Sequence, residues 1–597
     1  MTTKDGAAPE NLDKMQENLA RVEELTQRLI GVLGARKPVN PSLNAPSPEL
    51  FTTAAANYWA EMLENPQRIY EHQLEYWGKS VTHFMEAQQA FMKEGFAAPE
   101  DDTPTDKRFS NPLWQSHPYF NFVKQQYLIN AEALRKAVED VDDLEETDKR
   151  RLHFFSEQII DMLAPTNFLG TNPDALEKAV ETDGESLVKG LENLVADLEA
   201  NDGELLVKLV DESAFELGEN VASTPGKVVY RNKIMELIQY APATEEVHRT
   251  PLVIFPPWIN KFYILDLKAQ NSLIKWIVEQ GYTLFVVSWR NPGRAEADFG
   301  MGDYVESGIL EAIRVIREIT GEKQINAVGY CIAGTTLNLA LAYMKAKGDT
   351  SVKSATFFTA LTDFSDQGEF TPFLQDDFVD AIEEEVAEYG VLRSVIMSRT
   401  MSFLRSNDLV YTPAIKSYMM GETPPAFDLL YWNGDSTNLP GKMTMEYLRE
   451  LCQKNAFVED GLELLGERLH IRDVTVPTFA ATCESDHIAA WRDCYRGFMQ
   501  AGSRNKTFIV SQSGHIAGIV NPPSKKKYGH YVNTDLPKTP QDWWDNARFH
   551  EGSWWPRWEA WLKKRSGKMV PARTPGAKGY EPLCDAPGSY VVEKPVV

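Results

Sequence analysis

The chain has 597 residues, of which 43% are hydrophobic and 25% charged, as in soluble globular proteins of two domains or more. Its net charge of −25 argues against a nucleic-acid partner, because phosphate binding requires clustered cations. The five cysteines have neither CxxC pairing nor zinc spacing, so we expect no metal site and a reducing compartment.

The N-terminal segment predicts an amphipathic helix over residues 1–35 of a cytosolic protein. It has no basic region followed by an apolar run, so we expect no secretory signal, and no apolar stretch of the chain approaches the ~18 residues of a membrane span. Apolar side chains recur with a heptad-like spacing at Leu12, Met15, Leu19, Val22, Leu29 and Leu33. This seam would hold a partner or an apolar surface, or it would pack on the helix's own domain.

A mostly helical N-terminal domain is predicted over residues 36–220. It opens with the linker RKPVNPSLNAPSPEL, which is rich in Pro, Asn and Ser. The rest shows charged helical faces, few strand runs and no cluster of chemistry-bearing residues.

From residue 221 to 597 short apolar strands alternate with helical patterns. The strand runs are 250–258, 282–290, 325–331, 354–361, 476–486 and 506–515. Continuous apolar strands separated by helices are typical of a parallel sheet covered on both faces. Residues 362–475 interrupt this alternation and are too long for a loop, so we predict an inserted cap or lid there.

The stretch INAVGYCIAGTT, residues 325–336, has the pattern of a nucleophile elbow with Cys331 at its apex. A strand ends, a tight turn of small residues exposes one side chain, and a helix begins whose N-terminus favours a thiolate and an oxyanion. Ala333 stands where this motif usually has its second glycine, which makes the turn tighter. Taken alone the motif is weak, and a buried cysteine in a strand–helix turn is the alternative.

The order of further residues strengthens the interpretation, because triads on this kind of sheet follow the order nucleophile, acid, base. Asp486 follows the strand TFAAT, and His515 follows the strand TFIVSQ, so both lie at strand ends, where α/β sheets place their sites. Glu484 and Asp493 compete with Asp486 as the acid. His487 competes with His515 as the base, but as the immediate neighbour of Asp486 it fits a structural role better.

The predicted oxyanion hole combines two backbone N–H groups. One is that of Ile332, directly after the nucleophile, and the other comes from the loop after LVIFPP. Prolines cannot donate, which leaves Trp258 or Ile259, and we favour Ile259.

The sequence resembles the polyhydroxyalkanoate synthases, the bacterial enzymes that polymerise 3-hydroxyacyl-CoA. The resemblance covers about residue 110 to the C-terminal APGSYVV and rests on PPWINKFYILDL, VSWRNPG, GYCIAG, FDLLYWNGDSTNLPG, ESDHIAAW, SGHIAGIVNPP and GSWWPRW. The family's catalytic residues fall on Cys331, Asp486 and His515, and its motif allows alanine at Ala333. The resemblance implies an α/β-hydrolase fold with an inserted cap, preceded by a mostly helical N-terminal domain.

The resemblance also implies a function. The expected reaction is polymerisation of (R)-3-hydroxyacyl-CoA, such as 3-hydroxybutyryl-CoA, into polyester with release of CoA, through a cysteinyl thioester and without a cofactor. A single long chain is similar to the class I type, which favours short-chain monomers, although the one-subunit medium-chain type is also similar. The implied partners are the growing polyester chain, the granule surface in the cytoplasm and a second copy in a homodimer.

The sequence leaves two questions open, the function and the role of two aromatic residues. A thioesterase or esterase of the same fold, and a non-catalytic granule-associated protein, are the alternative functions. In the predicted cap, Trp432 and Tyr431 would wall an apolar substrate channel together with His487, or they would be ordinary core aromatics.

Overall fold

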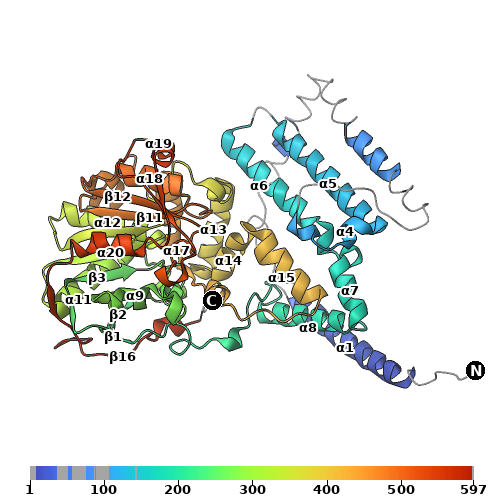
Figure 1. The fold of residues 1–597 in the computed structure, drawn as a ribbon, viewed down its shortest axis with the longest axis horizontal. Helices are drawn as coiled ribbons and strands as arrows, with labels where there is room; N and C mark the ends of the chain where they lie inside the picture. The colour runs from blue at the N-terminus through green and yellow to red at the C-terminus, as the bar shows by residue number, and fades with distance from the viewer. Residues whose placement is uncertain are drawn as a thin grey trace, which may run out of the picture. The chain divides into compact units, whose positions relative to one another are not determined.

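The computed structural model describes residues 8–35, 75–85, 106–141 and 144–594, with isolated positions between 43 and 88 (Figure 1). The chain divides into two compact units. The helical unit comprises Met1–Asp211 with Arg399–Pro425, and the sheet unit comprises Glu212–Ser398 with Ala426–Val597. The predicted cap covers residues 362–475. Its middle part, Arg399–Pro425, is grouped with the N-terminal helices.

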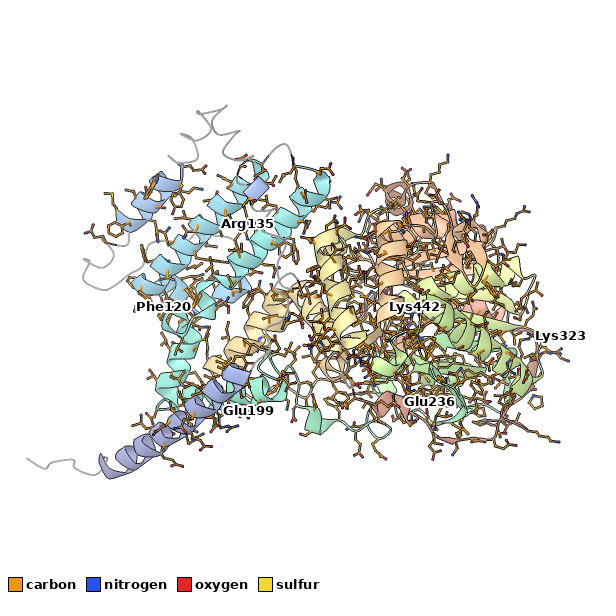
Figure 2. All side chains as sticks on the ribbon, turned by 180° about the vertical axis from the view of Figure 1, so that it is seen from behind. Phe120, Arg135, Glu199, Glu236, Lys323 and Lys442 are labelled. Carbon is orange, nitrogen blue, oxygen red and sulfur yellow. The ribbon has the colours of Figure 1, made fainter. Side chains whose placement is uncertain are left out.

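The helical unit consists of helices, some of which share a small aromatic core. Its helices are α1 (Ala8–Ala35), α4 (Leu113–Ser116), α5 (Pro118–Glu139), α6 (Glu146–Met162), α7 (Pro173–Glu181), α8 (Glu185–Ala200) and α15 (Thr412–Ala414). Trp114, Phe120 and Tyr127 pack with Ile160 in its core. Figure 2 labels Phe120 and Arg135 on α5, and Arg135 pairs with Glu157 of α6 at 2.7 Å.

Side-chain and backbone contacts explain why residues 399–425 belong to this unit. Arg399 pairs with Glu204, and the Tyr418 hydroxyl donates to Asp197 of α8 at 2.7 Å. A Cβ at Gly190 would lie 2.0 Å from the Tyr418 carbonyl oxygen, so only glycine permits this close approach.

The N-terminal helix packs on its own unit. Arg21 pairs with Glu185 and Glu192 of α8, and Leu25 is buried. Leu19, Val22 and Leu33 of the predicted seam are exposed, whereas the side chains of Leu12 and Met15 lie outside the described residues. Arg21 therefore joins the helix to α8, and most of the described seam faces solvent.

A twelve-stranded sheet forms the centre of the sheet unit, in the order β14-β13-β12-β11-β6-β5-β3-β4-β2-β1-β16, with β15 pairing with β3. The strands are β1 (Gly226–Arg231), β2 (Met235–Tyr240), β3 (Glu246–Phe255), β4 (Tyr282–Trp289), β5 (Ile325–Tyr330), β6 (Val352–Phe358), β11 (Thr478–Cys483), β12 (Lys506–Ser511), β13 (His530–Val532), β14 (Arg548–His550), β15 (Met569–Pro571) and β16 (Cys584–Asp585). The six predicted strand runs correspond to β3, β4, β5, β6, β11 and β12, and these pair in parallel. This confirms the predicted parallel sheet. Its antiparallel margins were not predicted.

Helices cover both faces of this sheet. They are α9 (Leu273–Glu279), α11 (Glu311–Thr320), α12 (Ile332–Ala346), α18 (Trp491–Gln500) and α20 (Trp555–Lys563). Alternate residues of β11 show the two faces, because Phe479 and Ala481 join the core cluster that includes α9 and α20, whereas Ala480 packs with α18. Both faces are thus apolar, as the continuous hydrophobic strands predicted.

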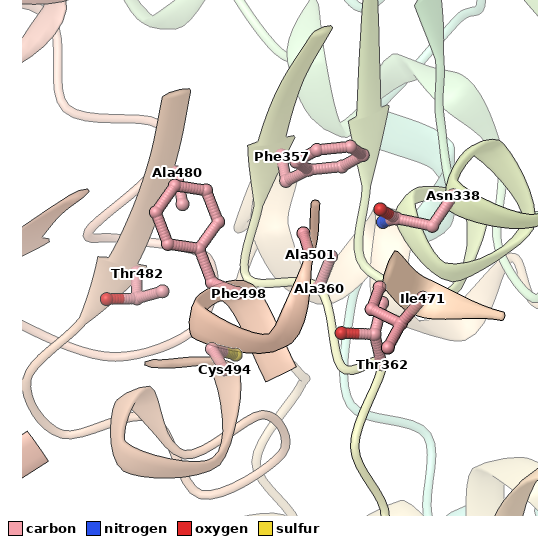
Figure 3. A pocket seen from close by; sticks show the side chains of 10 residues that line it. All are labelled: Asn338, Phe357, Ala360, Thr362, Ile471, Ala480, Thr482, Cys494, Phe498 and Ala501. Atoms are coloured by element: carbon pink, nitrogen blue, oxygen red, sulfur yellow. The ribbon is translucent and has the colours of Figure 1, made fainter. Parts of the chain in front are cut away.

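A small cavity lies on the α18 side of the sheet. Its volume is about 20 Å³, and Asn338 of α12, Ala480 of β11 and Phe498 of α18 are among the residues lining it (Figure 3). That volume suits about one water molecule. The cavity is too small to hold an acyl substrate.

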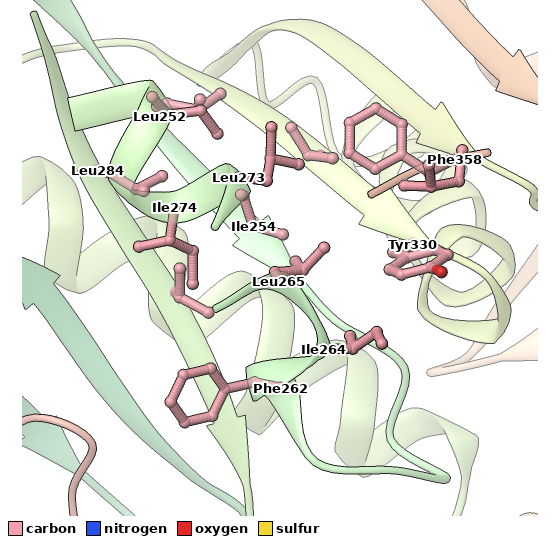
Figure 4. Close-up of a cluster of buried hydrophobic side chains, with 14 of the residues drawn as sticks. Leu252, Ile254, Phe262, Ile264, Leu265, Leu273, Ile274, Leu284, Tyr330 and Phe358 are labelled. Carbon is pink, nitrogen blue, oxygen red and sulfur yellow. The ribbon is translucent and has the colours of Figure 1, made fainter. Parts of the chain in front are cut away.

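The main core cluster lies on the opposite face and extends under the loop after β3. Figure 4 shows Leu252 and Ile254 of β3 with Leu273 of α9, and with Phe262 and Leu265 of that loop. The loop that carries the predicted oxyanion donor therefore continues into a fully packed segment.

The described parts of the cap that belong to the sheet unit are helices and two small antiparallel strand pairs. They are α13 (Asp376–Tyr389), the first half of α14 (Ser394–Phe403), α16 (Asp428–Gly434), α17 (Gly441–Glu446), the π-helical turn η13 (Tyr447–Gln453) and the strand pairs β7 (Val391–Leu392) with β8 (Leu439–Pro440) and β9 (Leu462–Leu464) with β10 (Glu467–Leu469). In the part of the chain that the structure describes, no helix has both the length and the apolar character needed to cross a membrane.

Candidate active site

Cys331 occupies a strained turn between β5 and α12. Its φ of 54° and ψ of −128° lie in a region that costs a residue with a side chain about 1–3 kcal/mol, and such strain concentrates at functional sites. The Cys331 N–H donates to the carbonyl of Phe358, on the neighbouring strand β6, at 2.8 Å. The turn therefore holds the thiol at the carboxyl ends of the parallel strands.

The crossing of strand and helix at this turn is made by Gly329 and Gly334. A Cβ at Gly329 would lie 2.6 Å from the Gly334 Cα, and a Cβ at Gly334 would lie 2.5 Å from the Cβ of Ala360. Ala333 is fully buried beside this contact. The position where strand and helix leave no room for a side chain is therefore Gly334, one residue after Ala333. This explains why the motif tolerates alanine at Ala333.

We expect Gly334→Ala to destabilise the protein, because the added methyl group overlaps Ala360 within a packed core. The expected cost is about 1–3 kcal/mol, the usual range for overpacking. Denaturant unfolding of the variant measures it. The matched variant Ala333→Gly should cost about 1 kcal/mol or less, and equal losses for the two would contradict this account of the crossing.

His515 and Asp486 form a buried hydrogen-bonded pair. The Nδ1 of His515 donates to Asp486 Oδ2 at 2.7 Å, and the side chains are 9% and 0% exposed. Asp486 Oδ1 accepts the N–H groups of Ile488 and Ala489, both at 2.9 Å. The carboxylate is thus fixed on three donors, the arrangement that orients an imidazole as a base.

The competing acids lie elsewhere. Glu484 is exposed, and Asp493 pairs with Arg496 at 2.6 Å. Burial raises the pKa of Asp493 to about 6. Of the three carboxylates considered from the sequence, Asp486 is the one bonded to His515.

Cys331 interacts with the same histidine. Burial lowers the pKa of His515, but the charges of Asp486 and Cys331, and the side-chain hydrogen bonds to both, outweigh burial and raise the pKa to about 10. The structure therefore brings Cys331, His515 and Asp486 together from three separate strand ends. Among the causes that raise the pKa, the charge of Asp486 comes first, and it stabilises the protonated imidazole.

Tyr330 supports His515, and the sequence pattern did not single it out. Its ring stacks on the imidazole with centroids 5.8 Å apart, and its hydroxyl donates to the His515 backbone carbonyl at 3.3 Å. The residue before the nucleophile thus packs against the base. Its position in the elbow was the signal available in the sequence.

The loop after β3 lies against the nucleophile helix. The indole N–H of Trp258 donates to the hydroxyl of Thr336, on the first turns of α12, at 3.2 Å. Thr437 of the cap donates its hydroxyl to the Trp258 carbonyl at 2.8 Å and its N–H to the Ile259 carbonyl at 3.3 Å. These bonds hold Ile259 near the start of α12, where Ile332 is the first helical residue.

The aromatic residues predicted for a channel brace this loop. Trp432 is buried in the main core and its indole N–H donates to the Lys261 carbonyl at 2.7 Å. Tyr431 is half-buried and stacks on Phe215 at 4.8 Å. His487 is partly exposed beside Asp486. A channel role for these three residues stays a prediction.

Tyr447 of η13 connects the cap to the loop after β3. Its side chain packs edge-on against Trp258 and Phe364, with ring centroids 6.0 and 5.8 Å apart. Burial, followed by the charges of Cys452 and Cys331, raises the pKa of Tyr447 well above its usual value. Tyr447, Trp258 and Phe364 therefore form an apolar, closely packed contact between the cap and the loop after β3.

The fold and the comparisons with known proteins identify the class of the protein. Residues 251–522 match the model of the alpha/beta hydrolase fold, which agrees with the parallel sheet and the elbow at Cys331. Residues 105–277 match the model of the poly-beta-hydroxybutyrate polymerase (PhaC) N-terminus. Among solved structures, the chain is similar to a thioesterase domain from the curacin biosynthetic pathway, with 11% identity over 49% of this chain and 94% of that one and a TM-score of 0.29.

Similar sequences along most of the chain define the family. The chain is 37% identical to the poly(3-hydroxyalkanoate) polymerase subunit PhaC of Rhizobium etli, over 98% of this chain and 92% of that one. It is 42% identical to the poly(3-hydroxyalkanoate) polymerase of Methylorubrum extorquens (82% and 81% covered) and 40% identical to the PhaC subunit of Cupriavidus necator (82% and 83% covered). The chain belongs to the poly(3-hydroxyalkanoate) polymerase family, and the members of this family are acyltransferases.

Proposed function

We propose that the chain polymerises (R)-3-hydroxyacyl-CoA into polyester and releases CoA, with the growing acyl group held as a thioester on Cys331. The observation that carries the proposal is the elbow thiol beside a buried His515–Asp486 pair. The names of the similar polymerases support the choice of substrate class.

The first half-reaction is acylation of Cys331. His515 takes the proton of the Cys331 thiol, and the sulfur attacks the thioester carbonyl. A Cys331 Sγ–carbon bond forms, and the bond between the carbonyl carbon and the CoA sulfur breaks. The N–H groups of Ile332 and Ile259 stabilise the oxyanion, and the proton on His515 passes to the departing CoA sulfur.

The charge balance around His515 favours this order of events. The charge of Cys331 is one of the causes that raise the pKa of His515. Acylation removes that charge, so the pKa of the imidazole falls and its proton is released to the leaving thiolate. The neutral imidazole is then ready to act as a base.

In the second half-reaction His515 takes the proton of a hydroxyl group, from a monomer or a chain end, which attacks the acyl-enzyme. Asp486 holds the imidazole orientation and stabilises its charge. A new oxoester bond forms, the Cys331 thioester breaks, and the proton on His515 returns to the Cys331 sulfur.

A cysteine nucleophile suits the free energies of these two half-reactions. Transfer from one thioester to another loses little free energy, so the acyl group stays activated until the hydroxyl attacks. Serine would form an oxoester in the first half-reaction, and the second transfer would then have little driving force. The thiolate is also the better nucleophile.

The buried site is suited to excluding water, which would otherwise hydrolyse the acyl-enzyme. His515 and Asp486 are almost inaccessible, and the cap residues Tyr447 and Thr437 contact Trp258 of the loop after β3. We infer that substrate access requires movement of the cap over 362–475. A preference for short-chain monomers, the class I type, a homodimer and a location at cytoplasmic granule surfaces belong to the same proposal.

The proposal is tested by incubating the protein with 3-hydroxybutyryl-CoA while following CoA release and product size together. We expect CoA release to accompany a polymer of high mass. CoA release with free 3-hydroxybutyrate would instead identify a thioesterase. If no CoA release depends on Cys331, the remaining function is that of a non-catalytic granule protein.

A further inference from the structure

The last turn of the described chain is held between two buried side chains of opposite charge. This turn, η16 (Tyr590–Val592), follows Ser589 and ends before Glu593, and we call Ser589–Glu593 the C-terminal clasp. The fully buried Glu236 of β2, labelled in Figure 2, accepts the N–H groups of Ser589 at 2.9 Å and Tyr590 at 3.0 Å. It also accepts the Ser589 hydroxyl at 2.8 Å.

The other end of the clasp is bound by Lys261. This side chain is 3% exposed, and its ammonium group donates to the backbone carbonyls of Tyr590 at 3.5 Å, Val591 at 3.0 Å and Glu593 at 2.7 Å. A carboxylate at the N-terminal end of a helical turn and a cation at its C-terminal end both complement the backbone dipoles. The clasp is thus fixed at both ends by charge.

The backbone of Lys261 belongs to the loop that carries the proposed oxyanion donor. Lys261 lies two residues after Ile259, and its carbonyl accepts the Trp432 indole at 2.7 Å. Asn260, between them, forms a backbone bridge with Ser436. The cap therefore holds the backbone of this loop, and the Lys261 side chain connects the loop to the C-terminal clasp.

Loss of the clasp would change the loop. A buried ammonium group that loses three carbonyl acceptors is strongly destabilised and must turn toward water. Such a movement shifts the backbone next to Ile259. Stabilisation of an oxyanion depends steeply on the position of the donor, so a shift of a fraction of an ångström reduces it.

We propose that the C-terminal clasp, acting through Lys261, fixes the Ile259 N–H in position to stabilise the oxyanion formed when Cys331 is acylated. Lys261 is then a positioning residue, more than 300 residues away in sequence from the backbone that holds it. The inference rests on the proposed function, because it assigns a role within the acylation step.

The test compares two reactions of Cys331 in the variant Lys261→Met. Acylation by 3-hydroxybutyryl-CoA forms an oxyanion, whereas alkylation by iodoacetamide only requires the sulfur to displace iodide. We expect kcat for CoA release to fall about 10-fold to 100-fold with KM little changed, while the rate of alkylation stays within about twofold of the parent. The exposed Lys275→Met is the matched control and should leave both rates unchanged.

Glu236→Gln provides a second, independent variant. It weakens the clasp from the end that does not contact the loop, and we expect the same selective loss of CoA release in smaller degree. An unchanged rate of CoA release in both variants, or equal loss of CoA release and alkylation, would overturn the proposal. So would a loss in Lys261→Met with none in Glu236→Gln. If the parent protein itself releases no CoA through Cys331, the proposed function fails instead.

Discussion

Replacing Cys331 by serine is expected to reduce polymer formation on the order of 10³-fold, although oxygen and sulfur differ little in size. Two physical effects add together. His515 must remove a proton from a much weaker acid, and the acyl group on an oxygen has lost most of the free energy that drives ester formation. Residual CoA release should end in a stalled acyl-enzyme or slow hydrolysis.

The measurement is the initial rate of CoA release from 3-hydroxybutyryl-CoA, together with the mass of the product and of the protein. Cys331→Ala is the control for the covalent bond and should release no CoA while unfolding like the parent, because the turn tolerates small residues. A serine variant that makes polymer at close to the parent rate would refute the argument from thioester energetics.

Replacing Asp486 by asparagine is expected to slow hydroxyl attack on the acyl-enzyme by about 10²–10⁴-fold and to slow acylation less. The alcohol needs a correctly oriented base, whereas the sulfur is already a good nucleophile. A pulse of substrate followed by mass spectrometry should therefore show the variant accumulating acylated Cys331. A variant that loses both steps equally would contradict this division of roles.

The same variant should change how stability depends on pH. The pKa of His515 is raised from 6.5 to about 10 in the folded protein, so its stabilising contribution is complete below pH 6.5 and is lost as the pH rises through about 10. Removing the Asp486 charge removes the first cause of the increase. We expect the parent to exceed Asp486→Asn in unfolding free energy by on the order of 3 kcal/mol at pH 7, and by much less at pH 10.5.

Denaturant unfolding at the two pH values measures this difference directly. His530 has its pKa lowered by burial to about 4, so its titration lies outside this window. A gap between parent and variant that stays constant from pH 7 to 10.5 would mean that His515 is not held in its charged form.

Several features of the fold and of the candidate site could be predicted from local patterns in the sequence. Continuous apolar runs bounded by turn residues predicted the six parallel strands, because a strand buried on both faces needs no polar alternation. The elbow at Cys331 and the strand-end positions of Asp486 and His515 followed from the order of residues alone. The sequence left Glu484 and Asp493 as competitors of Asp486, and in the structure Asp486 is the carboxylate hydrogen-bonded to His515, at 2.7 Å.

What the amino-acid sequence determined by itself was therefore the fold class, the six parallel strands of the central sheet and the candidate triad, because each depends on residue type, on local pattern and on order along the chain. Only the tertiary structure decided that 399–425 is grouped with the helical unit, that Gly334 rather than Ala333 carries the close crossing, and that the C-terminal clasp binds Lys261. These features depend on contacts between segments far apart in the chain. A buried cation and the carbonyls that satisfy it leave no periodic pattern, so no reading of neighbouring residues reveals that they meet.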